Sequence, residues 1–230
     1  RLSPMEILSE KNIDILFNLS ASPFTLEKND KRHRLFSASL SRLGCPMLYI
    51  NRRGLENNGK DCYTYDGMTA AYDPKGTLLA EAVPYQAERS CFSFDIAAKK
   101  LTAEQEMKPF AGDMLLPALR YGLKEFLSAI HAGRVVIGIS GGIDSAVNAA
   151  LYRSVLPAEN LRLVNTPTRF NSEATRNLAR RLAENLEAPF VELPIDSFIN
   201  ETVSQIDDLQ IPSPSDMKTL HLTGFMKENI

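Results

Sequence analysis

The stretch Arg134-Val-Val-Ile-Gly-Ile-Ser-Gly-Gly-Ile-Asp-Ser-Ala146 decides the fold, because it predicts a strand, a glycine loop and a helix in that order. Residues 135–139 form a short apolar run rich in β-branched side chains, as expected for a parallel strand covered on both faces. Gly141 and Gly142 permit a tight turn and leave backbone N–H groups free to converge on an anion at the helix N-terminus. The stretch therefore predicts a phosphate-binding loop.

The polar side chains of this loop indicate which phosphate chemistry it serves. Ser140 and Ser145 add hydroxyl donors. Asp144 adds a carboxylate, which a polyphosphate repels unless a hard cation lies between them, so Asp144 predicts Mg²⁺ and is its expected ligand. A helix-entry turn, in which Ser145 or Asp144 merely caps the helix, is the structural alternative. The loop is neither a Walker A loop, which needs Gly-Lys-Ser/Thr, nor a complete G-x-G-x-x-G loop.

The sequence pattern Ser-Gly-Gly-x-Asp-Ser after a strand resembles the PP-loop of the ATP pyrophosphatase superfamily. The resemblance implies cleavage of ATP between its α- and β-phosphates, with adenylation of a substrate oxygen and release of pyrophosphate. It also implies that Asp144 ligates Mg²⁺. The residues implied to hold the ATP phosphates are Ser140, Gly141, Gly142 and Ser145.

Composition and charge exclude several classes of partner. The formal net charge of the 230 residues is −2, which favours neither nucleic acid nor an anionic membrane as a partner. No apolar run approaches the ~18 residues that span a bilayer, and no signal-peptide pattern is present, so the cytoplasm is the expected location. One basic cluster, interleaved with Glu27 and Asp30, is interpreted as a solvated helix face. Its members are Lys28, Lys31, Arg32, His33 and Arg34.

The cysteines and histidines show neither disulfide nor metal-ligand spacing. Three cysteines leave an odd count, which favours reduced thiols, and the three histidines lie too far apart in sequence to predict a zinc site. These residues are Cys45, Cys62, Cys91, His33, His131 and His221.

The first half of the chain predicts a βαβ unit followed by a hairpin. The expected strands are 13–21, 46–51, 68–72, 77–82 and 90–96. A helix is expected over about 26–43, ended by Gly44, and Asp73-Pro-Lys-Gly76 is expected to turn the hairpin. The polar residues 97–108 are interpreted as a linker.

The second half alternates helices with strands, which is typical of a Rossmann-like, doubly wound parallel sheet. Helices are expected over 113–131, 146–156 and 172–186, with Ser172 as a cap, and strands over 135–139, 161–165 and 190–195. In such sheets ligands bind beyond the carboxyl ends of the strands, where residues 140–145 and 166–170 fall. Residues 209–218 are expected to form a mobile loop.

Two further segments extend the resemblance in the second half. Asn165-Thr-Pro-Thr-Arg-Phe-Asn-Ser-Glu173 and then Phe225-Met-Lys-Glu-Asn-Ile230 follow the loop in the order seen in the synthetase domain of NAD⁺ synthetases, a fold of adenine nucleotide α-hydrolase type. The resemblance implies that Thr166 and Arg169 lie near the ribose and adenine of ATP. It implies that Phe225 and Asn229, four residues apart on one helical face, contact deamido-NAD⁺. A core role for Phe225 and a surface salt bridge for Arg169 are the alternatives.

The first half resembles the carboxy-terminal part of a nitrilase-like glutaminase domain. The matching segments are Asn18-Leu-Ser-Ala-Ser-Pro-Phe24, Lys28, Arg32, Tyr49-Ile-Asn51 and Asp66-Gly67. The fusion of both domain types points to the glutamine-dependent NAD⁺ synthetases. It implies that Ser22 and Arg32 bind the glutamine carboxylate, although a turn serine and a solvated arginine explain these residues equally well.

Departures from the family pattern predict an internal fragment. The Glu-Lys-Cys triad of nitrilase-like enzymes lies upstream of residue 13 in this family and is absent here, and the family motif continues beyond Ile230. Cys45 is interpreted as a small core residue instead of a nucleophile. We expect residues 1–110 to be part of a nitrilase-like α/β sandwich (a carbon-nitrogen hydrolase domain). We expect residues 111–230 to be the amino-terminal part of a PP-loop ATP-binding domain, and the fragment alone to be inactive.

The resemblance implies one reaction and leaves alternatives open. The reaction is the ATP-dependent amidation of deamido-NAD⁺ to NAD⁺ through an adenylate, with ammonia derived from glutamine, and the family commonly forms homo-oligomers. One alternative is another PP-loop ligase, such as a GMP synthetase, an asparagine synthetase or a tRNA-thiolating enzyme. The other is a non-catalytic, degenerate homologue that keeps the fold.

Overall fold

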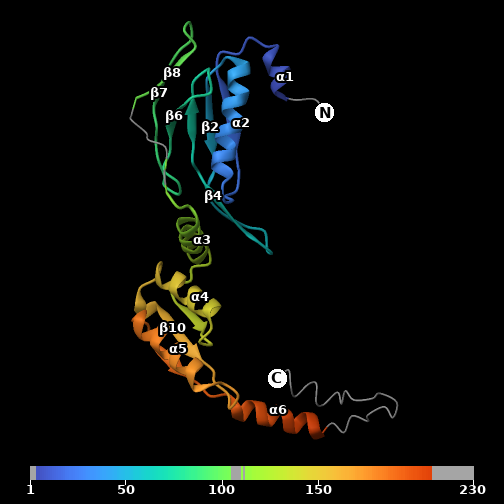
Figure 1. Cartoon of the computed structure of the whole chain (residues 1–230), viewed down its shortest axis with the longest axis vertical. Coiled ribbons are helices and arrows are strands. Elements are labelled where there is room, and N and C mark those ends of the chain that lie inside the picture. The colour runs from blue at the N-terminus through green and yellow to red at the C-terminus, as the bar shows by residue number, and fades with distance from the viewer. Residues whose placement is uncertain (1–3, 105–109, 111, 209–230) are drawn as a thin grey trace, which may run out of the picture. The chain divides into compact units, whose positions relative to one another are not determined.

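The computed structural model describes residues 4–104, 110 and 112–208. The chain divides into two compact units, Arg1–His131 and Ala132–Ile230 (Figure 1). Each unit contains its own sheet, and helices pack against both sheets. The prediction of an α/β protein is therefore confirmed.

The first unit is built on a four-stranded sheet with the order β1-β2-β5-β6. Its strands are β1 (Leu16–Ser20), β2 (Met47–Asn51), β5 (Ala70–Tyr72) and β6 (Leu78–Glu81). β1 and β2 are parallel and are joined by α2 (Lys28–Leu43), which ends at Gly44 with a left-handed φ of 65°. β5 and β6 are antiparallel neighbours. The predicted βαβ unit and hairpin are both confirmed.

The two faces of this sheet are covered by different elements (Figure 1). The helix side packs α2 against the sheet through a buried cluster of Leu40, Met47, Tyr49, Ala70 and Tyr72. The opposite side packs the hairpin of β7 (Phe92–Asp95) and β8 (Lys100–Ala103) against Ala71 and Ala80. On that side the β1 residues Phe17 and Leu19 stay 56% and 74% exposed. The hairpin therefore covers only part of the sheet.

Several elements of the first unit differ from the sequence prediction. The linker predicted over 97–108 is wrong at β8, where only Leu101 is fully buried and the polar neighbours hid the strand. The hairpin of β3 (Arg53–Asn57) and β4 (Cys62–Asp66) was not predicted, although Asn58-Gly59 between them is a typical hairpin signal. The short helix α1 (Pro4–Ser9) was also not predicted.

Helix α3 (Leu115–Ala129) confirms the helix predicted over 113–131 and packs within the first unit. It contacts β3 and β4, and its Tyr121 ring stacks on Tyr85 with 4.9 Å between ring centroids. The domain boundary predicted after residue 110 stays a prediction. The two compact units divide later, after His131, so α3 belongs to the first of them.

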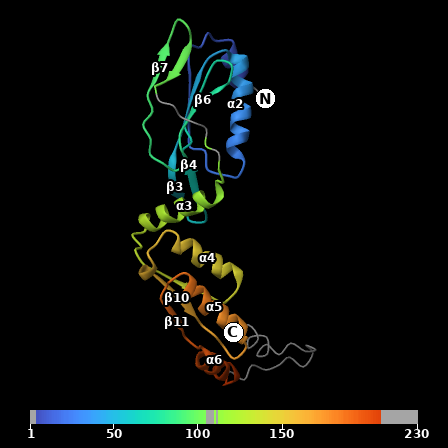
Figure 2. The same ribbon diagram turned by 60° about the vertical axis from the view of Figure 1, so that its left-hand side comes forward.

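The second unit contains three parallel strands in the order β11-β10-β9. Its elements are β9 (Val135–Gly138), α4 (Ile143–Arg153), a 3₁₀ turn (Ala158–Asn160), β10 (Leu161–Asn165), α5 (Glu173–Asn185), β11 (Phe190–Glu192) and α6 (Asp196–Asp208). Helix α4 begins three residues before the predicted start at 146, and β11 ends three residues before the predicted end at 195. α6 was not predicted. Figure 2 shows α4 and α5 beside β10.

The expectation that these strands are covered on both faces is wrong for the described residues. The side chains of Ile137 and Leu163 form one core with Ala149 of α4 and with Ala179 of α5, so both helices lie on the same face. Val136, which points to the other face, is 69% exposed.

No described helix is long and apolar enough to cross a membrane.

Neighbouring residues of β9 test this one-sided covering. Ile137→Ala should lower the free energy of unfolding by about 2–5 kcal/mol, because it removes a buried side chain. Val136→Ala should change it by at most about 0.5 kcal/mol, because that side chain is already exposed. Urea unfolding of both variants measures the difference. A large loss for Val136→Ala would show that the second face is covered in solution.

Candidate functional site

The glycine loop connects β9 to α4 and has two conformationally different glycines. Gly141 has a left-handed φ of 85°, whereas Gly142 precedes the first turn of α4 with a φ of −86°. A Cβ atom added to Gly141 would lie 2.2 Å from the Thr175 carbonyl oxygen, so the loop lies directly against the first turn of α5. Ser172 caps α5 as predicted, since its hydroxyl accepts a hydrogen bond from Thr175 N.

The two predicted serine hydroxyls come together inside this loop. Gly142 N donates to Ser140 Oγ at 3.2 Å, and Ser145 Oγ donates to the Gly142 carbonyl at 3.0 Å. Ser140 N lies 3.3 Å from Ser145 Oγ, which accepts its hydrogen bond. These hydrogen bonds connect the start of the loop to its end and to the first turn of α4, and such internal bonds restrict the conformations of a loop.

Asp144 lies exposed in the first turn of α4. The residue preceding that helix is Gly142, which has no side chain to cap it, and Asp144 accepts no hydrogen bond from another described residue. The structural alternative is therefore not supported for Asp144, whereas Ser145 does make hydrogen bonds at the start of the helix. The first N–H groups of a helix have no intrahelical partner and attract an anion. No three His, Cys, Asp or Glu side chains of the described residues gather to hold a metal. A cation bound by Asp144 would therefore need further ligands from a bound phosphate and from water.

The end of β10 lies beside the glycine loop. Gly138 pairs with Val164 in the parallel register, so Ser140 and the exposed Thr166 leave the sheet at the same edge. Asn165, which was not predicted as a site residue, is 4% exposed and donates from Nδ2 to the Ile139 carbonyl. Its amide thereby joins the two strand ends. The sequence signal that could have identified Asn165 is a polar residue at the end of an apolar strand.

Arg169 is directed toward α6. Its Nη2 donates to Asn200 Oδ1 at 3.1 Å, and its backbone N donates to Asp196 Oδ1 at 3.1 Å. Within the described residues it has no ion pair, so the salt-bridge alternative is not supported either. Its implied role near adenine stays a prediction. Phe225 and Asn229 lie outside the described residues.

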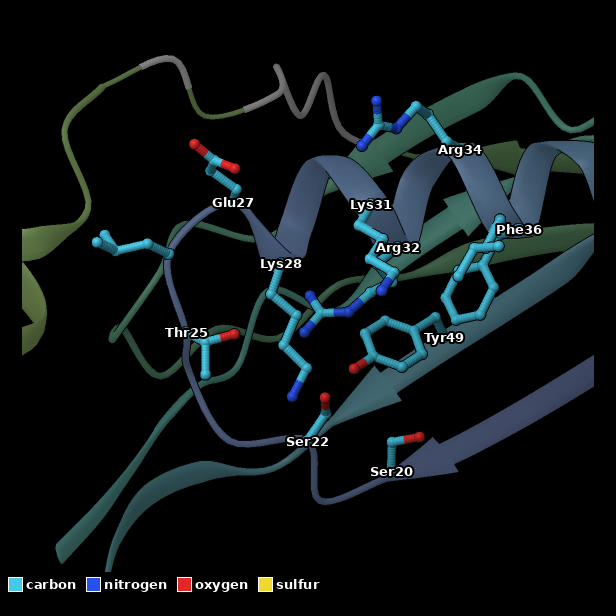
Figure 3. Close-up of a pocket in the computed structure, with 12 residues that line it drawn as sticks. Ser20, Ser22, Thr25, Glu27, Lys28, Lys31, Arg32, Arg34, Phe36 and Tyr49 are labelled. Atoms are coloured by element: carbon cyan, nitrogen blue, oxygen red, sulfur yellow. The ribbon is translucent and has the colours of Figure 1, made fainter.

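The first unit contains a cavity of about 540 Å³ beside the N-terminal half of α2. Ser22 and Arg32, the residues implied to bind glutamine, both line it. Figure 3 shows Lys28, Arg32 and Tyr49 converging above Ser22. Lys28 and Tyr49 had no role assigned from sequence, although both lie in the segments that carry the glutaminase resemblance. The lining contains four cationic side chains (Lys28, Lys31, Arg32 and Arg34) and one carboxylate (Glu27), which favours an anionic group.

The solvated-face interpretation of the basic cluster is wrong for Arg32. Its side chain is directed toward the sheet, where the residue is 7% exposed and the guanidinium lies 4.8 Å from the centroid of the Tyr49 ring. Arg32 Nη2 lies 3.7 Å from Asp66 Oδ2. Burial raises the pKa of Asp66, and the Arg32 charge partly opposes that rise. Burial beside Arg32 also lowers the pKa of Lys28.

Ser22 is fixed by the end of β2. Asn51 Oδ1 accepts a hydrogen bond from Ser22 N at 2.8 Å, and Asn51 Nδ2 donates to the Ser22 carbonyl and to Asp66 Oδ1. The buried Asn51 amide therefore connects Ser22, in the turn after β1, to Asp66, the carboxylate beside Arg32. Cys45 is fully buried, as predicted, and burial raises the pKa of its thiol. None of the three cysteines lines this cavity.

The two loop glycines give a matched pair of substitutions. Gly141→Ala should lower the free energy of unfolding by at least roughly 1–2 kcal/mol, because an alanine in the left-handed region is strained and its Cβ would overlap the Thr175 carbonyl. Gly142→Ala should cost much less, because its φ is ordinary and the nearest atom would lie 3.3 Å away. Urea unfolding measures both. Equal losses would contradict the close approach of the loop to α5.

Comparison with known proteins finds relatives over most of the chain. The NAD synthase family model matches residues 115–224. The glutamine-dependent NAD⁺ synthetases of Synechocystis and of Rhodobacter capsulatus are each 28% identical, over 85% and 81% of this chain. The chain spans about a third of the length of these curated relatives, 35% and 34%.

Two solved structures share the fold of nearly the whole chain. The glutamine-dependent NAD⁺ synthetase of Acinetobacter baumannii, solved in complex with ADP, matches 97% of this chain and 40% of its own, with a TM-score of 0.80 and 21% identity. The enzyme of Cytophaga hutchinsonii matches 96% of this chain and 42% of its own, with a TM-score of 0.71 and 20% identity. Residues 115–224 match the NAD synthase family model, and the chain is similar to part of the glutamine-dependent NAD⁺ synthetases.

Proposed function

We propose that the chain belongs to an enzyme that amidates deamido-NAD⁺ to NAD⁺, with ATP as the activating substrate and glutamine as the source of ammonia. The observation that carries this proposal is the glycine loop at the carboxyl edge of a parallel sheet, with an uncapped helix behind it, inside the NAD synthase match. Relatives named glutamine-dependent NAD⁺ synthetase support the choice of nitrogen donor.

The loop residues would bind and orient the triphosphate. The N–H groups at the start of α4 and the hydroxyls of Ser140 and Ser145 would neutralise charge on the departing pyrophosphate while the nicotinate carboxylate attacks the α-phosphorus. Gly141 and Gly142 would keep side chains away from the phosphates. Thr166, at the same sheet edge, and Arg169 would lie near the ribose and adenine. The ADP complex of the Acinetobacter baumannii structure is in keeping with a nucleotide site.

Asp144 fits a Mg²⁺ ion that is shared with the phosphates. Its carboxylate is exposed next to the loop, and it has no hydrogen bond or ion pair with another described residue. One carboxylate with phosphate oxygens is a usual ligand set for Mg²⁺, which keeps several waters. The ion would supply charge neutralisation of the polyphosphate. Asp144 would fix its position relative to α4.

The cavity of the first unit would hold the α-carboxylate of glutamine. Arg32 and Ser22 are the implied ligands, and Lys28 adds a second cation beside them. The cationic lining is the observation that supports this assignment. Binding of deamido-NAD⁺ by Phe225 and Asn229, a homo-oligomeric state and a cytoplasmic location stay predictions.

The products distinguish this reaction from ordinary ATP hydrolysis. The product of the complete gene should release AMP and pyrophosphate when it is given ATP, Mg²⁺, deamido-NAD⁺ and ammonia, because a PP-loop holds the β- and γ-phosphates as the leaving group. Chromatography of the nucleotide products measures the outcome. Formation of ADP and phosphate would exclude the PP-loop assignment, and the absence of any turnover would favour a degenerate homologue.

Removal of the Asp144 carboxylate tests the metal role. Asp144→Ala in the complete gene product should lower turnover by at least about 100-fold, the loss expected when charge stabilisation at a leaving group is removed. Stability should be unchanged, since the residue is exposed. Glu159→Ala, which removes an exposed carboxylate next to the opposite, amino end of β10, is the matched control and should leave turnover unchanged. An unaltered rate and Mg²⁺ dependence in Asp144→Ala would exclude Asp144 as a ligand.

A further inference from the structure

Asn29, in the first turn of α2, is hydrogen-bonded to the buried arginine of the glutamine cavity. Arg32 Nη1 donates to Asn29 Oδ1 at 2.8 Å. This is the single hydrogen bond that the Arg32 side chain makes with another described residue. Arg32 Nη2 has no hydrogen-bond partner and lies 3.7 Å from Asp66 Oδ2. Asn29 itself does not line that cavity. The orientation of the guanidinium plane therefore depends on a residue outside the proposed binding site.

The other end of the Asn29 amide is held by a buried carboxylate. Asn29 Nδ2 donates to Glu81 Oε1 at 2.9 Å. Glu81 ends β6 and is 2% exposed. Its Oε1 also lies 2.9 Å from His33 Nε2, and its Oε2 accepts a hydrogen bond from Phe110 N at 3.2 Å. These hydrogen bonds outweigh burial and lower the pKa of Glu81, so the carboxylate is charged at neutral pH.

The two charges fix which way the amide faces. Glu81 accepts hydrogen bonds and Arg32 donates them, so Asn29 satisfies both only with Nδ2 toward Glu81 and Oδ1 toward Arg32. A rotation of the amide by 180° would place oxygen beside the carboxylate and nitrogen beside the guanidinium, and both contacts would be repulsive. The interaction between β6 and α2 thereby sets the position of the Arg32 guanidinium.

We infer that Asn29, held by Glu81, is a positioning residue that aims Arg32 at the carboxylate of glutamine. The inference rests on the proposed function of the cavity. It adds two residues that do not line the cavity and that act through Arg32. A guanidinium recognises a carboxylate through directed hydrogen bonds, so loss of its alignment should weaken binding even though its charge remains.

The test is the Michaelis constant for glutamine in the product of the complete gene. Asn29→Ala should raise the KM for L-glutamine about tenfold, as expected for the loss of one hydrogen bond to a charged group. The kinetics with ammonium chloride as nitrogen donor should stay unchanged. Glu81→Gln should raise the same KM by a smaller factor, because the amide that replaces the carboxylate still offers an oxygen to Asn29.

A matched control separates positioning from stability. Ser37→Ala removes a hydrogen bond of 2.6 Å from α2 to the Gly76 carbonyl, on the same helix but without contact to Arg32. It should lower the melting temperature about as much as Asn29→Ala and leave the KM for glutamine unchanged. If Ser37→Ala raises that KM equally, a general loosening of α2 explains the effect and the positioning role is wrong.

Arg32→Ala distinguishes failure of the inference from failure of the proposed function. Arg32→Ala should raise the KM for glutamine, and adding Asn29→Ala should cause no further rise, because Asn29 acts through Arg32. An additive rise in the double variant would overturn the positioning role. A normal KM in Arg32→Ala, or no glutamine-supported turnover in the unaltered protein, would overturn the proposed glutamine site itself. An effect of Arg32→Ala with none of Asn29→Ala or Glu81→Gln would overturn only the inference.

Discussion

A parallel strand-helix-strand connection is the constraint on which both candidate sites depend. Parallel strands require a crossover, so the chain must turn at the carboxyl end of a strand before a helix can return. In the first unit this turn contains Ser22, and in the second it contains the glycine loop. Neither α2 nor α4 receives a side-chain cap at its start. Both turns therefore present polar groups that internal hydrogen bonds leave incompletely satisfied.

The two proposed sites would attract anions by different means. The second unit relies on backbone N–H groups and hydroxyls, and its Asp144 stays exposed. The first unit would rely on cationic side chains, of which Arg32 is buried, and buried charges need partners. Asp66 and Glu81 illustrate the rule, since both are almost fully buried. The pKa of Asp66 is raised by burial, whereas several hydrogen bonds lower that of Glu81. For Asp66 the effect of burial exceeds that of its partners, whereas for Glu81 the hydrogen bonds and the charge of His33 exceed it.

Local signals in the sequence predicted most elements but not their environment. Apolar runs and turn residues predicted the glycine loop, β10 and α2, because such signals act within a few residues. The strand β8 was missed because its pairing with β7 buries only Leu101 fully. The burial of Arg32 and the exposure of Val136 could not be predicted. Both depend on which face a neighbouring element covers, and that information lies far away in the chain.

The two glycines of the loop differ in whether the fold itself requires a glycine at their positions. Gly141 is required by the fold, because its backbone is left-handed and the Thr175 carbonyl occupies the space of a side chain. Gly142 has an ordinary backbone conformation, and a Cβ there would meet only the Ser140 hydroxyl, so the fold alone does not require glycine at that position. What an additional side chain would obstruct is the start of α4. A glycine at position 142 is therefore in keeping with the proposed phosphate site, in which a ligand would approach the backbone closely.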